Sequence, residues 1–239
     1  SGGTRQQDWL LSRAGKALYE PRHLQPYLVA PFDQRWVYYD PQLLGRARSS
    51  VMRHVLAGSP AWVFLRQSTN RGAYDHFLAV RTLASDRAFY SVRGAPFLAP
   101  LYLQRADQRR PNLQAAAIQA FAERLKLRFR ANGGDSGDEF FDAVDVFHYL
   151  YAIFFSPTYR QRYLEALQIG FPRAPITTDR DLFRRLCRLG AQLTTLHLFQ
   201  AAAVSDPARV SPPGGEHCVA RGYPRFVVAD EVGRSSDSS

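Results

Sequence analysis

The hydrophobic pattern of the chain changes near residue 111, and this change constrains the fold more than any other feature. After residue 111 the apolar residues recur at helical spacing, as Ala117, Phe121 and Leu125 do. Before it, short segments rich in Val, Phe and Tyr are separated by turn residues, a pattern typical of antiparallel strands. These segments are Ala61–Gln67, His76–Leu83, Arg87–Val92 and Phe97–Leu103. We therefore predict an α+β protein, with a mostly antiparallel mixed sheet in residues 1–110 and a helical part of about four helices in residues 111–202.

Capping residues mark where two of the first three helices begin. Asn112 is suited to cap a helix that runs to about Phe129. A second helix is predicted over 141–155. Ser156 followed by Pro157 combines an N-cap residue with a proline at the first helical position, so a third helix is predicted to start there.

The fourth helix carries a regular row of leucines. Thr178 and Asp181 resemble a capping box, and the helix is predicted to run to about Ala202. Its leucines lie on one face, which we expect to be buried against the other helices. These leucines are Leu182, Leu186, Leu189, Leu193 and Leu196.

Shorter segments complete the outline. Residues 5–19 are predicted to form a helix with Leu18 turned inward, and Arg35–Tyr39 a short strand. Residues 43–56 are compatible with a helix. Residues 203–239 have the composition of a linker, one possible strand and a disordered tail.

The charge of the chain favours a polyanionic partner. The net charge is +10, and Lys16 and Lys126 are the only lysines, so nearly all of the positive charge is arginine. Coding bias explains the choice of arginine over lysine but not the excess of bases over acids. Nucleic acid binding and a merely basic protein both remain compatible with this charge.

Arginines with few neighbouring acids are the candidate DNA contacts. Between residues 31 and 56 the only acids are Asp33 and Asp40. Guanidinium groups can hold phosphates or bind guanine through two hydrogen bonds, although a solvated helix face would look the same in sequence. The predicted DNA-binding residues are Arg35, Arg46, Arg48, Arg53, His54, Arg66, Gln67, Arg71 and Arg160. For Arg160, helix capping with solvent exposure is favoured over contact with DNA.

The aromatic residues of the same stretch divide between two faces of a strand. Trp36 and Tyr38 share one face, and Tyr39 lies with Arg35 and Val37 on the other. We expect one face to pack into the core and the other to lie near DNA. Packing of all these aromatics in the core is the alternative.

The sequence lacks several catalytic and metal-binding motifs. It has no GxxxxGK[ST] phosphate loop, no GxSxG nucleophile elbow, no CxxC pair and no HxxxH pair. Asp142 and Asp145 are three residues apart and are read as the exposed edge of a helix. The most apolar run, 144–155, is too short to cross a membrane. We interpret the chain as one that binds rather than catalyses, with no metal or cofactor of its own, and its two cysteines as free thiols that fit the cytoplasm.

Several separated blocks resemble the C-terminal specificity region of type ISP restriction-modification enzymes. They are PFDQRWVYYDPQLLGRARSSVMRHVL (31–56), VFLRQ (63–67), RAFYSVRGAPFLAPLYL (87–103), DVFHYLYAIFFSPTYRQRYLEALQIGFPRAPIT (145–177) and LFRRLCRLGAQLTTLHLF (182–199). Their order, as well as their wording, is similar to that family across most of residues 8–200.

The resemblance implies a function and a set of partners. Enzymes of this family are single chains with a nuclease, a helicase-like translocase, an S-adenosylmethionine-dependent adenine-N6 methyltransferase and a terminal target recognition domain. The resemblance implies that this chain is that last domain, cut from a longer protein, and that it recognises double-stranded DNA. S-adenosylmethionine, ATP and Mg²⁺ would then serve the parent enzyme, and the methyltransferase and helicase domains would be its other partners. Alternatives are an accessory part of the methyltransferase clamp on DNA and a module that docks onto other domains through the leucine-rich helix; RNA binding is less supported, since no RRM or KH signature occurs.

Overall fold

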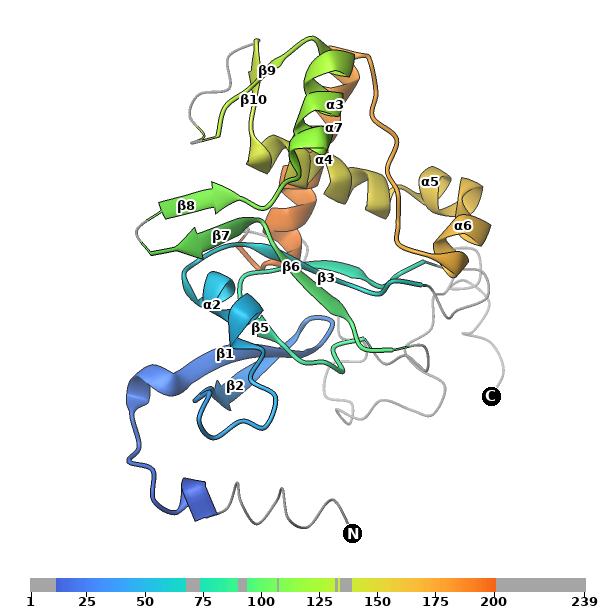
Figure 1. Cartoon of the computed structure of the whole chain (residues 1–239). Coiled ribbons are helices and arrows are strands. Elements are labelled where there is room, and N and C mark those ends of the chain that lie inside the picture. The colour runs from blue at the N-terminus through green and yellow to red at the C-terminus, as the bar shows by residue number, and fades with distance from the viewer. Residues whose placement is uncertain are drawn as a thin grey trace, which may run out of the picture. The chain divides into compact units, whose positions relative to one another are not determined.

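The computed structural model describes residues 12–67, 74–89, 94–106, 108–131, 133 and 139–200 (Figure 1). These residues all belong to one compact unit, Ser1–Ala202. Several predictions concern residues outside this description: Arg71, the first part of the helix over 5–19, and everything predicted for 203–239. The α+β class is confirmed, because the described strands lie mainly in the first half of the chain and the longer helices in the second.

The first sheet has the order β2-β1-β5. Strand β1 (Leu24–Ala30) follows a short 3-10 helix, η1 (Pro21–His23), and pairs antiparallel with β2 (Asp33–Tyr38) and parallel with β5 (Leu83–Ala84). The sequence did not predict β1, because Pro26 cannot donate to a strand ladder and argues against a strand. In the structure Pro26 lies opposite Trp36 on the neighbouring strand.

The second sheet has the order β4-β3-β6 and is antiparallel throughout. Its strands are β4 (Phe77–Val80), β3 (Ala61–Phe64) and β6 (Phe97–Pro100). These strands confirm three of the four predicted extended segments. The fourth, Arg87–Val92, is wrong for its described residues, which form a turn and bend whose Ala88 and Phe89 are buried. Apolar residues that anchor a turn have the same composition as a short strand.

Two further strand pairs are small. β7 (Tyr102–Arg105) and β8 (Gln108–Pro111) form an antiparallel hairpin, and β9 (Arg128–Phe129) pairs parallel with β10 (Phe140–Phe141). The strand content of the described residues is therefore distributed over several small sheets.

Residues 12–14 are helical, and besides η1 six helices lie wholly within the described residues. Their bounds are α2 (Ser49–Leu56), α3 (Ala115–Leu125), α4 (Ala143–Phe155), α5 (Pro157–Arg162), α6 (Leu164–Ile169) and α7 (Arg180–His197). The Ser156 cap is confirmed, since its Oγ accepts a hydrogen bond from the Tyr159 N–H at 3.3 Å. The Asn112 cap is wrong, because Gln114 is the N-cap of α3 and the Asn112 amide donates to the Pro100 carbonyl instead.

The acidic pair at the start of α4 is a capping box rather than an exposed helix edge. Asp142 is the N-cap, is only 8% exposed, and accepts hydrogen bonds from the Val144 and Asp145 N–H groups. The Asp145 carboxylate accepts from the Asp142 N–H in return. It also contacts the guanidinium of Arg184 at 3.3 Å, which joins α4 to α7.

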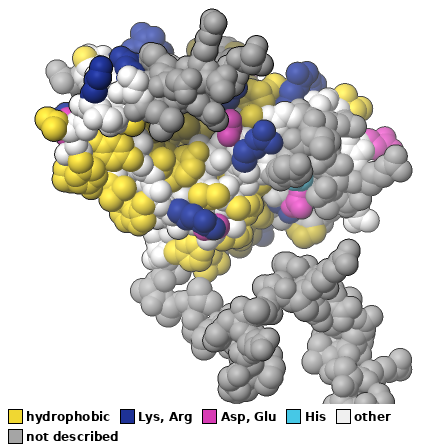
Figure 2. Space-filling view, turned by 90° about the horizontal axis from the view of Figure 1, so that it is seen from below, with side chains coloured by type: hydrophobic (Ala, Val, Ile, Leu, Met, Phe, Trp, Pro, Cys, Tyr) yellow, Lys and Arg dark blue, Asp and Glu magenta, His cyan; other side chains and the backbone are white. Residues whose placement is uncertain are grey.

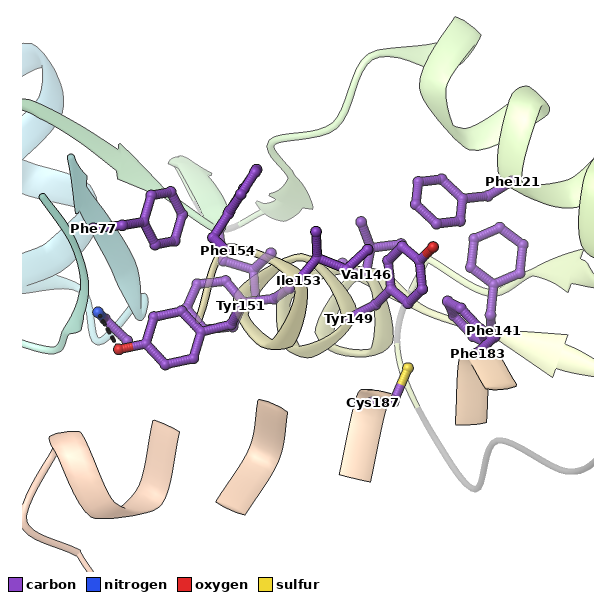
Figure 3. Close-up of a cluster of buried hydrophobic side chains, with 14 of the residues drawn as sticks. Phe77, Phe121, Phe141, Val146, Tyr149, Tyr151, Ile153, Phe154, Phe183 and Cys187 are labelled. Carbon is purple, nitrogen blue, oxygen red and sulfur yellow. Dashed lines mark hydrogen bonds between the residues drawn. The ribbon is translucent and has the colours of Figure 1, made fainter. Parts of the chain in front are cut away.

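Helix α4 is the centre of the main hydrophobic core (Figure 3). Its Tyr149 lies against Phe121 of α3 and Phe183 of α7, and its Phe154 lies against Phe77 of β4. The Tyr151 hydroxyl accepts a hydrogen bond from the Ala79 N–H at 3.1 Å, so α4 also fixes the second sheet. Burial of so many aromatic rings supplies the apolar area that stabilises the helical part against the strands.

The leucine row of α7 is not the buried face, and that prediction is wrong. The residues of α7 that face α4 and the core are Phe183, Cys187, Gly190 and Thr194. Leu186 and Leu193 pack only at the edge of the core, while Leu182, Leu189 and Leu196 are 37%, 52% and 45% exposed. The small side chains at 187 and 190 let α4 approach closely, which leucines there would prevent.

The other corrections concern the first sixty residues. Leu18 is 86% exposed, so the prediction that it turns inward is wrong. The helix predicted over 43–56 begins only at Ser49, because Arg48 adopts a left-handed conformation with φ 48° and ends the preceding turn.

Candidate nucleic-acid interface

A groove of about 650 Å³ opens between the two three-stranded sheets and the start of α2. Its floor is apolar and comes from both sheets, with Val63 and Leu65 on or just after β3 and Leu83 on β5. Tyr27 of β1 and Phe97 of β6 add aromatic walls. An apolar floor with polar groups at the edge is the usual composition of a ligand-binding cleft.

Four of the predicted site residues line this groove. Arg46 and Arg48 come from the loop before α2, and Arg66 and Gln67 follow β3. Asp86 is the one carboxylate among the described residues that line the groove. Three guanidinium groups against one carboxylate give the groove a positive potential.

Tyr39 fixes the loop that carries Arg46 and Arg48. Its ring is buried, and its hydroxyl donates to the Ala47 carbonyl at 2.6 Å. The Arg48 carbonyl accepts the first hydrogen bonds of α2, from the N–H groups of Val51 and Met52. Arg46 and Arg48 therefore lie on either side of Ala47, whose carbonyl is held by the buried Tyr39.

Arg66 and Gln67 connect the groove to the segment that follows α6. The Arg66 guanidinium lies over the Phe171 ring, 5.5 Å from its centroid, and the Phe171 ring packs against Phe97 at 5.1 Å. The Gln67 side-chain amide donates to the Ile169 carbonyl. Because that N–H group already holds Ile169, the guanidinium of Arg66 is the stronger candidate for contact with a ligand.

Arg35 lies on the side of β2 that faces the groove. Arg35 and Val37 are two residues apart and so share one face of the strand, and Val37 lines the groove. Arg35 also lies opposite Tyr27 of β1, which lines the groove too. Its guanidinium is exposed and pairs with Asp33 at 2.9 Å, and this hydrogen bond lowers the pKa of Asp33. The pair leaves less of the Arg35 charge available to a ligand.

The expected division of the β2 aromatics into a core face and a DNA face is partly wrong. Trp36 is 66% exposed, and Tyr38 packs at the edge, where its ring stacks on Tyr19 and its hydroxyl accepts from the Glu20 N–H. Tyr39 is the buried member, and it lies on the face that Arg35 shares.

His54 and Arg53 are on α2 but do not line the groove. His54 is buried, and its Nδ1 accepts a hydrogen bond from the Gln104 N–H at 2.9 Å. Burial, and the neighbouring Arg53, lower the pKa of His54, so the neutral imidazole joins α2 to β7. The structure therefore gives His54 a structural role in place of the predicted DNA contact, and it leaves Arg53 exposed on the outer side of α2.

Arg160 is also separate from the groove. It belongs to α5, where its Nε donates to the Phe154 carbonyl at 2.5 Å and its guanidinium lies 4.6 Å from the centroid of the Phe155 ring. Burial lowers the pKa of Arg160. These contacts support the structural explanation of Arg160, in which it closes the end of α4.

The basic side chains do not form one large patch on the face of the molecule seen in Figure 2. On the face shown in Figure 2, Lys and Arg side chains lie singly among wider areas of hydrophobic side chains. The grouping that matters is local, at the groove. Sequence reasoning missed Tyr27, Phe97 and Asp86 there. Tyr27 lies on β1, which was not predicted, while Phe97 was read only as the start of a strand and Asp86 only as part of a turn between strands.

Comparisons with known proteins identify the family of this chain. A family model described as the type ISP C-terminal specificity domain matches residues 3–230. The chain belongs to this family. No curated protein matches it.

Solved structures with the same fold come from much longer chains. One, described as a cryoEM structure of a DrdV–DNA complex, has a TM-score of 0.61 and 25% identity over 78% of this chain and 17% of that one. The type ISP enzyme LlaBIII bound to DNA has a TM-score of 0.58 and 17% identity over 80% of this chain and 12% of that one. A nuclease-deletion mutant of the type ISP enzyme LlaGI with a DNA substrate mimic has a TM-score of 0.52 and 16% identity, over 76% and 14%. This specificity domain therefore spans less than a fifth of the length of each of these chains.

Two further findings concern membranes and metal ions. Within the described ranges, no helix is long and apolar enough to cross a membrane. The same residues bring together no group of three His, Cys, Asp or Glu side chains that could hold a metal ion.

Proposed function

We propose that this domain recognises a sequence in double-stranded DNA for a longer type ISP restriction-modification enzyme. The observation that carries the proposal is the gathering of Arg46, Arg48 and Arg66 at one apolar groove in a chain of the specificity family. The structural neighbour at 25% identity is described as a DNA complex, which supports the same ligand. Arginine is the side chain best suited to both tasks, because it can hold a phosphate or bind the O6 and N7 of guanine.

Within this proposal the domain directs the chemistry of the parent and does not perform it. Adenine-N6 methylation and cleavage take place in the preceding domains, which use S-adenosylmethionine, ATP and Mg²⁺. We assign no residue of the described part a catalytic role. A cytoplasmic location accords with this function, and with the free, buried thiol of Cys187.

The salt dependence of DNA binding tests the proposal. The logarithm of the affinity should fall with the logarithm of the salt concentration, with a slope of about 0.9 for each phosphate that is neutralised. Alanine at Arg46, Arg48 or Arg66 should weaken binding, whereas alanine at Arg185, which is exposed on α7 and does not line the groove, is the matched control. An affinity that does not change with salt would exclude a nucleic acid ligand.

The same variants separate phosphate contacts from base contacts. A residue that holds a phosphate should weaken binding equally on all sequences and reduce the salt slope by about 1. A residue that reads a base should relax one position of the site by about 1–3 kcal/mol of discrimination. The site itself can be found by mapping methylated adenines in DNA from a host that expresses the full parent enzyme.

The exposed leucines of α7 favour a second role beside DNA recognition. Leu182, Leu189 and Leu196 form an apolar row on the outer side of the helix, with Arg185 and Arg188 beside it. We infer that this row contacts another domain of the parent chain, such as the methyltransferase. Glutamate at Leu189 should then expose the junction of the domains to protease in the full enzyme while the isolated domain keeps its affinity for DNA.

A further inference from the structure

Asp86 occupies a well-defined position in the groove. The N–H of Ser85 extends the pairing of β5 with β1 by donating to the Leu28 carbonyl at 2.9 Å. The next turn is closed by two hydrogen bonds to Ser85, from the Ala88 N–H to its carbonyl at 3.1 Å and from the Arg87 N–H to its Oγ at 3.0 Å. Ala88 is buried and holds the turn to the core below. The exposed carboxylate of Asp86 is therefore carried on a backbone fixed from both sides.

The charge of Asp86 is opposite to that of the groove it lines. Arg46, Arg48 and Arg66 line the same groove, and none of them is within ion-pair distance of Asp86 in the described part of the chain. A carboxylate in such a place repels a phosphate and so weakens the general attraction for DNA. The carboxylate favours binding only if it meets a hydrogen-bond donor of the ligand.

Duplex DNA offers such donors only on its bases. The phosphates and the sugar oxygens within a strand accept hydrogen bonds, while the exocyclic amino groups of cytosine and adenine donate them in the major groove. We propose that Asp86 is a specificity-determining residue that accepts a hydrogen bond from the amino group of a cytosine or an adenine. This inference rests on the proposed function. It assigns to Asp86 the recognition of a hydrogen-bond donor on a base, which the arginines cannot perform because they only donate.

Base analogues in the mapped site test the inference. In duplexes where one cytosine or adenine at a time lacks its exocyclic amino group, the wild-type domain should lose affinity at one position, by roughly 5- to 150-fold. The Asp86→Ala variant should bind the normal and the analogue duplex equally at that position. It should also bind unrelated duplexes at least as tightly as the wild type, because a repulsive charge has been removed. Asp181→Ala removes an exposed carboxylate from the first turn of α7, outside the groove, and should keep the wild-type response to the analogues.

Three results would overturn the inference. Weaker binding of Asp86→Ala to every sequence would mean that the carboxylate orients the arginines. Stronger binding to every sequence with unchanged discrimination would mean that it acts only by repulsion. A response to the analogues that is identical in Asp86→Ala and wild type would place the reading group elsewhere. Absence of any duplex binding by the wild type is a different outcome, which would refute the proposed function as well.

Discussion

Gly190 is a point of close approach between α7 and α4, and replacing it by alanine tests the packing of the core. A Cβ at this position would lie 1.9 Å from the His148 carbonyl oxygen, 2.6 Å from its carbon and 3.0 Å from the His148 Cα. All three atoms belong to the backbone, so no side chain can move aside. The two helices would have to separate by about 1 Å to relieve the contact.

The magnitude follows from two opposed effects. Alanine is favoured over glycine by about 1 kcal/mol in a helix interior. Overpacking costs typically 1–3 kcal/mol, and here the backbone must move and Phe183 and Cys187 loosen in the core, so we take the total cost as about 3–5 kcal/mol. We expect Gly190→Ala to lower the free energy of unfolding by roughly 2–4 kcal/mol, which is a fall in Tm of about 5–15 °C for a domain of this size.

Urea and thermal unfolding of the whole chain would measure the change. Gly170→Ala is the matched control, because a Cβ there meets no atom within 4 Å and the backbone is extended, so its stability should stay within about 0.5 kcal/mol of wild type. If Gly190→Ala were as stable as wild type, or more stable by the helix-propensity gain, the close contact of α4 with α7 would be refuted.

Two further predictions concern buried polar groups. The Tyr151 hydroxyl lies 3.1 Å from the Ala79 N and 2.6 Å from the His197 Nδ1, so Tyr151→Phe leaves both groups without this partner and should lower the free energy of unfolding by about 1–3 kcal/mol in chemical denaturation. The control Tyr163→Phe, at a half-exposed tyrosine, should lower it by less than about 0.5 kcal/mol. Equal losses in the two variants would argue against the hydrogen bonds of Tyr151. Burial holds the pKa of His54 below its ordinary value of 6.5, so the stability from this neutral side chain is complete above that pH and is lost as the pH falls through the folded-state pKa. The unfolding free energy of wild type should therefore fall more steeply below about pH 6.5 than that of His54→Gln, and parallel curves would contradict the assignment.

Local sequence signals identified the fold class and many element positions, and they failed where a signal had two meanings. The Ser156-Pro157 cap and the strands around Ala61 and Phe77 were found because cap chemistry and β-branched or aromatic runs act over a few residues. Strand β1 was missed because Pro26 is a breaker in most contexts. Residues 87–89 were taken for a strand because buried turn anchors have strand-like composition.

At the candidate site, too, the sequence identified individual residues but not the contacts between them. The arginine-rich stretch 31–56 identified Arg46 and Arg48, since positive charge with few neighbouring acids is visible along the chain, and the end of a predicted strand identified Arg66. The sequence could not show that these residues meet at one groove, nor that His54 turns inward to accept a hydrogen bond from Gln104, fifty residues later. Those are contacts between segments distant in sequence.

The sequence by itself determined that this protein is an α+β chain with an arginine-based charge and the ordered motifs of the type ISP specificity family. Those properties depend on composition, period and residue order. Only the tertiary structure decided which face of α7 is buried, because the choice between the leucine row and the row through Gly190 depends on how closely α4 can approach. Likewise, only the tertiary structure placed Asp86 among the arginines, because the groove forms where two sheets pack together and cannot be inferred from the sequence of any one strand.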